Sequence, residues 1–147
     1  MKKSLLALLI ASAFACAQPR NNNESQDESL NETESTEHEG VYFENIEDGS
    51  TISSPFLLKM GINGMEVEPK GAPRDGFGHH HLLVNDGYAP EGTVIVADDT
   101  HIHYGGGQVS DSVALAPGDY KLTLQFADGM HVSYGEKWSK TISVTVE

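Results

Sequence analysis

The stretch DYKLTLQF, Asp119–Phe126, alternates between polar and apolar residues along its whole length. The stretch TISVTV, Thr141–Val146, repeats this pattern near the end of the chain. Successive side chains of a β-strand point to opposite faces, so such alternation gives each strand one apolar and one polar face. Both stretches therefore predict strands that are buried on one side and solvated on the other.

Six other stretches have the length and composition of strands. They are VYFE from Val41, PFLLKMGI from Pro55, HHLLV from His80, TVIVA from Thr93, HIHY from His101 and DSVAL from Asp111. Turn-forming sequences such as EDGS, NDGYAPEG and APGD separate them, and no stretch has the periodicity of an amphipathic helix. Seven or eight short strands at intervals of about ten residues predict an all-β fold, a single immunoglobulin-like antiparallel β-sandwich. The Cys–Trp–Cys pattern of true immunoglobulin domains is absent.

The first residues of the chain, MKKSLLALLIASAFAC, have the pattern of a secretory signal peptide over residues 1–15. Their apolar run is too short to span a bilayer, which takes about 20 residues. The only cysteine of the chain, Cys16, follows directly, at the place where a bacterial lipoprotein carries its lipid. We expect lipid attachment at Cys16, and so a protein of the cell envelope on the periplasmic or cell-surface side of a bacterial membrane. A secreted protein with one free thiol is the alternative.

Residues 16–40 form a predicted linker. Between Ala17 and Gly40 there are seven acidic residues, one arginine and a single large aliphatic residue, Leu30. This segment cannot bury enough apolar surface to offset the entropy of ordering, so we expect it to be disordered. The remaining residues, 41–147, are enough for one domain.

The chain is strongly acidic, with 22 acidic against 9 basic residues and a net charge of −13. Such a charge repels nucleic acid and favours cations. We therefore expect no nucleic-acid partner. The expected partners are the membrane, through the lipid anchor, a divalent metal ion and an envelope protein.

Histidines are concentrated in two short stretches, GHHHLLV (Gly78–Val84) and HIHYGGGQ (His101–Gln108). On a strand, the two histidines of an H-x-H pair share one face and start about 6–7 Å apart at the backbone. If the two strands are neighbours with their histidine faces on the same side, the rings converge. Imidazole is a common ligand of copper and zinc. The predicted metal ligands are His79, His81, His101 and His103, with His131 from a loop.

The same residues allow a second interpretation. Buried histidines often serve as hydrogen-bonded core residues, and His80 favours this role because it shares the apolar face of its strand. A cluster of imidazoles could also act as a pH sensor. Asp98, Asp99 and Asp128 could orient ligand rings from outside the site, and three methionines could supply a thioether to a softer copper ion; these are Met60, Met65 and Met130.

Catalysis is not expected. Residues 17–147 hold no cysteine, and no serine lies in the setting of a nucleophile elbow. A metal-activated water is the one remaining route to hydrolysis. The leading hypothesis is a non-catalytic module that binds copper or zinc. The competing hypothesis is a structural or protein-interaction module whose histidines are hydrogen-bonded core residues.

Four segments, GINGMEVEPKG, GHHHLLV, THIHYGGGQVSDSVALAPGDYKLTLQFAD and HVSYGEKWSKTISVTV, follow one another in an unusual combination. In this order the sequence resembles the bacterial family called domain of unknown function 4399, over nearly all of residues 41–147. The resemblance implies a small secreted or periplasmic β-rich domain with no assigned activity. The family positions carried over are His79, His80, His81, His101, His103, Gly105, Gly107, Gln108 and His131. The chain departs from the family at Tyr120 and Tyr134, where other members have histidines.

Overall fold

The two alternating stretches form the long antiparallel hairpin of a computed structural model that describes residues 38–147. They correspond to β8 (Gly118–Ala127) and β9 (Ser139–Val146), with Leu122 opposite Ile142. A short 3₁₀ helix, η1 (Glu136–Trp138), leads into β9. Leu122, Leu124 and Ile142 are buried, and Lys121 and Thr141 are exposed, as the alternation predicts. The predicted solvated face of β8 is wrong from Thr123 onward, because Thr123 and Gln125 are also fully buried.

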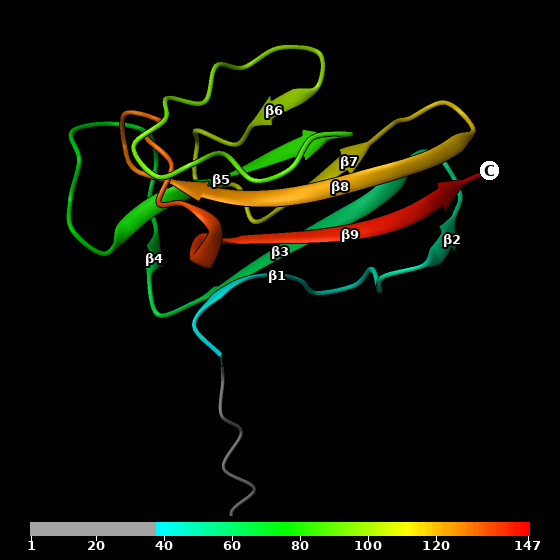
Figure 1. Cartoon of the computed structure of the whole chain (residues 1–147), viewed down its shortest axis with the longest axis horizontal. Coiled ribbons are helices and arrows are strands. Elements are labelled where there is room, and N and C mark those ends of the chain that lie inside the picture. The colour runs from blue at the N-terminus through cyan, green and yellow to red at the C-terminus, as the bar shows by residue number, and fades with distance from the viewer. Residues whose placement is uncertain (1–37) are drawn as a thin grey trace, which may run out of the picture. The chain divides into compact units, whose positions relative to one another are not determined.

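This hairpin belongs to the larger of two sheets, whose strand order is β2-β9-β8-β5-β4, with β6 also paired to β5 (Figure 1). Its other members are β2 (Ser50–Ile52), β4 (Glu66–Val67), β5 (Phe77–Val84) and β6 (His101–His103). β5 lies inside the sheet, because β8 pairs with one of its edges while β4 and β6 share the other. Nearly every residue of β5 is buried, so it is the strand best placed to hold a site away from bulk water.

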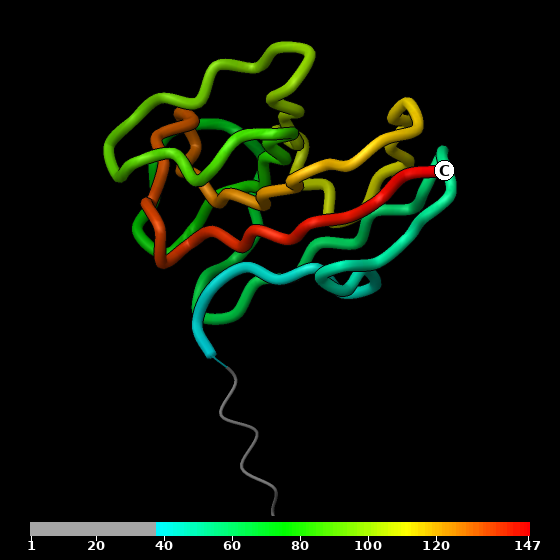
Figure 2. Tube along the Cα trace, turned by 45° about the vertical axis from the view of Figure 1, so that its right-hand side comes forward, coloured from blue at the N-terminus to red at the C-terminus, as the bar shows by residue number. Residues whose placement is uncertain are grey.

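The smaller sheet has the order β1-β3-β7 and consists of β1 (Gly40–Phe43), β3 (Phe56–Asn63) and β7 (Ser110–Val113). Its inward residues, such as Leu58 and Met60, join inward residues of the larger sheet in one hydrophobic cluster. The turned view shows the β1 and β3 segments running beside the red β9 strand (Figure 2). The core therefore lies between the two sheets.

The predicted all-β fold is confirmed, and the two sheets fit the predicted sandwich. Two details differ from expectation. The described residues contain nine strands rather than seven or eight, and the short strands β2 and β4 pair in parallel with β9 and β5. Neither short strand has an alternating pattern long enough to be recognised in sequence. The immunoglobulin-like character stays a prediction.

The stretch Thr93–Ala97, TVIVA, was predicted to be a strand, and this prediction is wrong. It makes only an isolated bridge, between Val94 and Val132. Ile95 is buried, but Val94 and Val96 are 56% and 72% exposed. Only one side chain of this segment points inward, and no strand pairs with the segment along its length. The segment is therefore part of a surface loop and not a strand of a sheet.

The predicted signal peptide (residues 1–15), the lipid attachment at Cys16 and most of the predicted linker (16–40) lie outside the described residues. At the other end of that linker, Gly40 is the first residue of β1. Within residues 38–147, no helix has the length and apolar character needed to cross a membrane.

Candidate metal site

β5 places three consecutive histidines in the interior, and all three are fully buried. His79 and His81 point to one face of the larger sheet, and His80 points to the other, as the two-residue period of a strand requires. β6 pairs with β5 so that His103 lies directly opposite His81. This register brings the two H-x-H stretches together on one face.

The rings of His79, His81 and His103 form a nearly equilateral triangle, with all three centroid separations at 5.0 Å. The Nε2 atoms of His79 and His103 are 3.1 Å apart. One nitrogen from each ring lies within 4.8 Å of the others. A tetrahedral ion bound at 2.0–2.1 Å needs nitrogens about 3.3–3.4 Å apart, so small ring rotations would bring the three nitrogens onto one ion.

A fourth ring, that of His131, covers this triangle from the loop after β8. Its centroid lies 4.5 Å from that of His103, 5.2 Å from that of His79 and 5.8 Å from that of His81. His131 adopts a left-handed backbone with φ 67°. The Asp128 carboxylate holds the turn by accepting hydrogen bonds from the Met130 and Val132 amides.

Four of the eight ring nitrogens in this four-histidine cluster have no hydrogen-bond partner among residues 38–147. These are Nδ1 of His79, both ring nitrogens of His81, and Nε2 of His131, and all are buried. Buried polar atoms are nearly always hydrogen-bonded, and an unpaired one costs about 1–3 kcal/mol. A hydrogen-bonded histidine core would show the opposite pattern, so the arrangement calls for another partner for these nitrogens.

Burial favours the neutral state of His79, His81 and His103. Burial, together with the neighbouring imidazoles, lowers the pKa of His79 to about 4 and that of His81 to about 3. Burial and the nearby His131 also lower the pKa of His103. Neutral imidazole is the form that binds a metal ion, so these ligands need not lose a proton at neutral pH.

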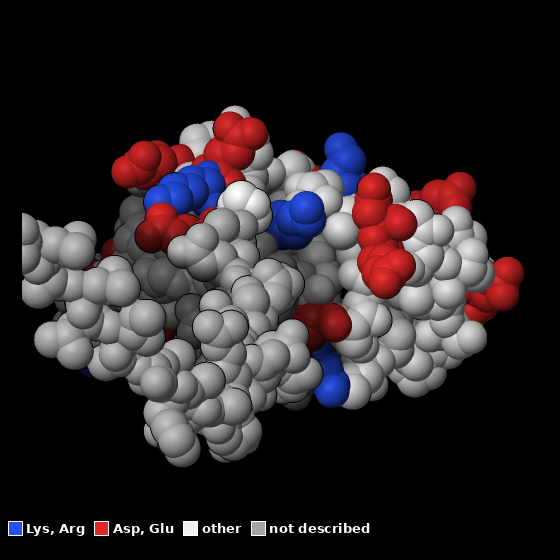
Figure 3. Space-filling view, turned by 90° about the horizontal axis from the view of Figure 1, so that it is seen from below, with Lys and Arg blue, Asp and Glu red and all other residues white. Residues whose placement is uncertain are grey.

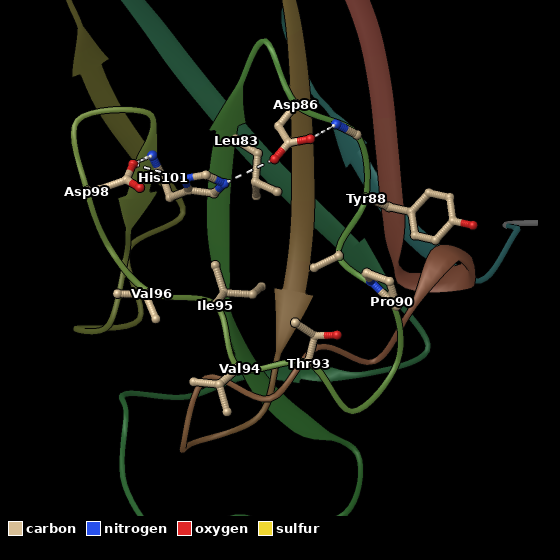
Figure 4. A pocket seen from close by; sticks show the side chains of 12 residues that line it. Leu83, Asp86, Tyr88, Pro90, Thr93, Val94, Ile95, Val96, Asp98 and His101 are labelled. Carbon is tan, nitrogen blue, oxygen red and sulfur yellow. Dashed lines mark hydrogen bonds and ion pairs between the residues drawn. The ribbon is translucent and has the colours of Figure 1, made fainter.

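His101 lies apart from the cluster, although it shares a strand face with His103. It pairs with Leu83 across β5 and β6, and its ring contacts two carboxylates instead of another histidine. Its Nδ1 is 2.9 Å from Asp98 Oδ1, and its Nε2 is 3.4 Å from Asp86 Oδ2. Figure 4 shows the ring between these two side chains.

The other residues named in the sequence analysis lie outside the four-histidine cluster. His80 faces the core, where its ring lies 5.1 Å from that of Phe126, edge to face, but neither of its buried ring nitrogens has the predicted hydrogen bond among the described residues. Asp98 bonds to His101, and Asp99 is exposed. Met60 lies in the hydrophobic core, Met65 packs against it, and Met130 is 61% exposed. The Gln108 side chain accepts a hydrogen bond from the Gly106 amide.

Sequence reasoning missed one residue that bears on the site and gave a second residue a different role. Lys70 lies close enough for its positive charge to lower the pKa values of His79 and His103. Asp128 was considered as a support for ligand rings, whereas its observed bonds fix the turn that carries His131. No local sequence pattern predicts the role of Lys70 or of Asp128, because both roles depend on contacts between loops that are far apart in sequence.

These observations define an all-β protein whose larger sheet and one adjoining loop gather four histidines. The chain belongs to the family described as "Domain of unknown function (DUF4399)", which it matches over residues 58–147. That range includes β5, β6 and the loop of His131, so every member of the cluster lies within the family domain. No curated protein and no solved structure matches the chain.

Proposed function

We propose that this protein is a non-catalytic module that binds a divalent transition metal, copper or zinc, in the bacterial envelope. His79, His81 and His103 would supply three ligands from β5 and β6, and His131 would supply a fourth from its loop. An imidazole site of this kind suits Zn²⁺ and, by intrinsic affinity, Cu²⁺ above it.

The observation that carries this proposal is that three histidine rings gather on one face of the larger sheet, while half of the ring nitrogens in the four-histidine cluster are buried without a hydrogen-bond partner among the described residues. Three rings present one nitrogen each within 4.8 Å of one another, and His81 has no hydrogen bond to either ring nitrogen among the described residues. Hydrogen bonds among these neutral imidazoles stabilise the cluster little, because only His79 and His103 lie within hydrogen-bond distance of each other. A shared metal ion would give one nitrogen of each ring a partner.

The remaining parts of the proposal rest on the sequence. A signal peptide and a lipid at Cys16 would attach the domain to a membrane, with an acidic linker as spacer. The net charge of −13 disfavours nucleic acid, and on the face in Figure 3 the basic side chains lie scattered among acidic ones instead of forming a basic patch. An envelope protein that exchanges metal with this domain is the partner we propose.

The test is a metal titration of the full chain, prepared without a histidine tag and stripped with a chelator. Calorimetry with Cu²⁺ and with Zn²⁺ should give one ion per chain, bound more tightly than micromolar. His103→Ala should lose this binding, whereas His101→Ala, changed two residues along the same strand, should keep it. Electron paramagnetic resonance of the Cu²⁺ form should show coupling to several nitrogens.

The competing function is a structural or protein-interaction module that binds no metal. Under that function neither ion binds stoichiometrically, and His103→Ala changes only the thermal stability of the fold. That pair of results would overturn the metal proposal. Equal loss of binding in both variants would instead restore His101 to the ligand set.

A further inference from the structure

The structure has a second polar cluster, outside the four-histidine cluster, at the end of a surface cavity. The cavity has a volume of about 380 Å³ and lies between the turn after β5, the loop Thr93–Asp98 and His101. Ligand cavities in proteins start at roughly this size. Nothing in the proposed metal function uses this cavity.

The walls of the cavity are largely apolar. Leu83 and Ile95 are buried beneath it, while Tyr88, Val94 and Val96 are 45%, 56% and 72% exposed around it. Apolar side chains exposed together beside polar groups are typical of a binding surface. Figure 4 shows Val94, Ile95 and Val96 on one side of the opening, Asp86, His101 and Asp98 gathered at the opposite end, and the ring of Tyr88 directed away from them.

The polar end is negatively charged whatever the state of its histidine. Asp86 and Asp98 both contact the single ring of His101, which carries at most one positive charge against two negative ones. Among the described residues that line the cavity, none is lysine or arginine. The cavity thus presents uncompensated negative charge next to an apolar wall.

Both carboxylates are held in position before any ligand arrives. Asp98 Oδ1 accepts hydrogen bonds from the Thr100 and His101 amides at 2.7 and 2.8 Å. Asp86 Oδ1 accepts one from the Gly87 amide at 2.8 Å. Oδ2 of Asp86, which lies 3.4 Å from His101 Nε2, keeps a lone pair that can accept a hydrogen bond from a ligand, and a preorganised acceptor lowers the cost of binding one.

We propose that this cavity binds a small organic cation, an ammonium group attached to a short apolar body. The ammonium would donate hydrogen bonds to Asp86, with the charge of Asp98 on the far side of the His101 ring adding to the attraction, and the apolar body would lie against Leu83 and Ile95. The proposal is independent of metal binding, because none of these residues belongs to the four-histidine cluster.

The test is an NMR titration of the full chain with benzylamine, followed through the amides of Gly87, Ile95 and Val96. Benzyl alcohol is the matched probe, since it has the same ring without the charge. We expect benzylamine to saturate these shifts at a concentration of about 1 mM, typical of so small a ligand, and benzyl alcohol to bind at least tenfold more weakly.

Asp86→Asn should weaken benzylamine binding about tenfold while its amide side chain keeps the contact with the Gly87 backbone. Asp99→Asn is the matched control, because it removes an equal charge from an exposed neighbour that does not line the cavity. Equal binding of the two probes, no localised shifts, or unchanged affinity in Asp86→Asn would each overturn the proposal. The comparison of probes needs no variant, so it stands even if Asp86→Asn does not fold.

His103→Ala separates this inference from the metal proposal. If the cavity acts independently, this variant binds benzylamine as the unchanged protein does, even though it has lost the metal. Loss of benzylamine binding in His103→Ala would show that the cavity depends on the four-histidine cluster, and would overturn the claim of independence.

Discussion

Gly105 determines at the residue scale whether the ring of His103 can join the cluster. A Cβ atom at Gly105 would lie only 2.1 Å from Cε1 and Nε2 of that ring. The ring is free to turn away where a backbone atom could not, so Gly105→Ala should fold and displace His103. We expect a loss of metal affinity of at least tenfold, measured by calorimetry, with the melting temperature nearly unchanged.

The matched control for this prediction is Gly106→Ala. A Cβ atom there meets the side chain of Gln108 at 3.1 Å and no histidine. Metal affinity should therefore be retained in Gly106→Ala. Equal affinities in the two alanine variants would show that the position of the His103 ring does not matter for binding.

His131 combines a strained backbone with its place over the cluster. Its φ of 67° lies in the left-handed region, which asparagine tolerates better than most residues. His131→Asn should therefore preserve the turn while removing the imidazole. We expect metal affinity to fall about tenfold or more with no loss of stability, measured by calorimetry and by thermal unfolding. Unchanged affinity would remove His131 from the ligand set and leave three protein ligands.

At the scale of the elements, the close approach of β5 and β8 keeps the histidine strand in register. Gly78 pairs near the end of β8, and a Cβ atom there would lie 2.2 Å from the carbonyl oxygen of Ala127. A backbone atom cannot move aside as a side chain can, so Gly78→Ala should separate the strands. Overpacking of this kind costs about 1–3 kcal/mol, measured by chemical denaturation.

Gly87→Ala provides the comparison for that loss of stability, because no atom of residues 38–147 lies within 4 Å of the added Cβ atom. Its stability should match that of the unchanged protein. If Gly78→Ala were equally stable, the pairing of β5 with β8 would have to tolerate a wider spacing than the structure has.

The sequence predicted the strands better than it predicted the register and the contacts between them. Strict alternation identified β8 and β9, and the two-residue period put His79 and His81 on one face. The register of β5 against β6 has no local signal, yet it places His103 opposite His81 and leaves His101 beside two carboxylates. The position of His131 over the cluster depends on a turn that Asp128 holds by a hydrogen bond. The sequence pattern does not predict this turn either. Thr93–Ala97 looked like a strand because composition does not show whether a partner strand is present.

For the molecule as a whole, three buried histidines make stability depend on pH. The pKa of His79 and of His80 is lowered to about 4 and that of His81 to about 3, mainly by burial. In the unfolded chain all three titrate near 6.5. Between these limits the unfolded state binds more protons than the folded state, so the free energy of unfolding falls as the pH falls.

The metal-free protein should therefore be most stable above about pH 6.5 and lose stability steadily below it. Each neutral histidine contributes a slope of about 1.4 kcal/mol per pH unit, so the three together remove about 4 kcal/mol per unit. A domain with a typical free energy of unfolding of about 5–15 kcal/mol would lose most of it before pH 4. Urea denaturation at pH 7.5, 6.0 and 5.0, in the presence of chelator, measures this slope while most carboxylates remain ionised.

His80→Leu distinguishes the effect of a buried histidine on the pH dependence of stability from the effects of other titrating groups. His80 faces the core beside Phe126, so leucine suits its surroundings and removes one titrating group without touching the cluster. The slope between pH 6 and pH 5 should then drop by about 1.4 kcal/mol per pH unit, a third of the total. A stability that stays flat from pH 7.5 to 5.0 would mean that the folded protein takes up protons at these histidines. In that case the cluster would open in acid, and any bound metal would be released there.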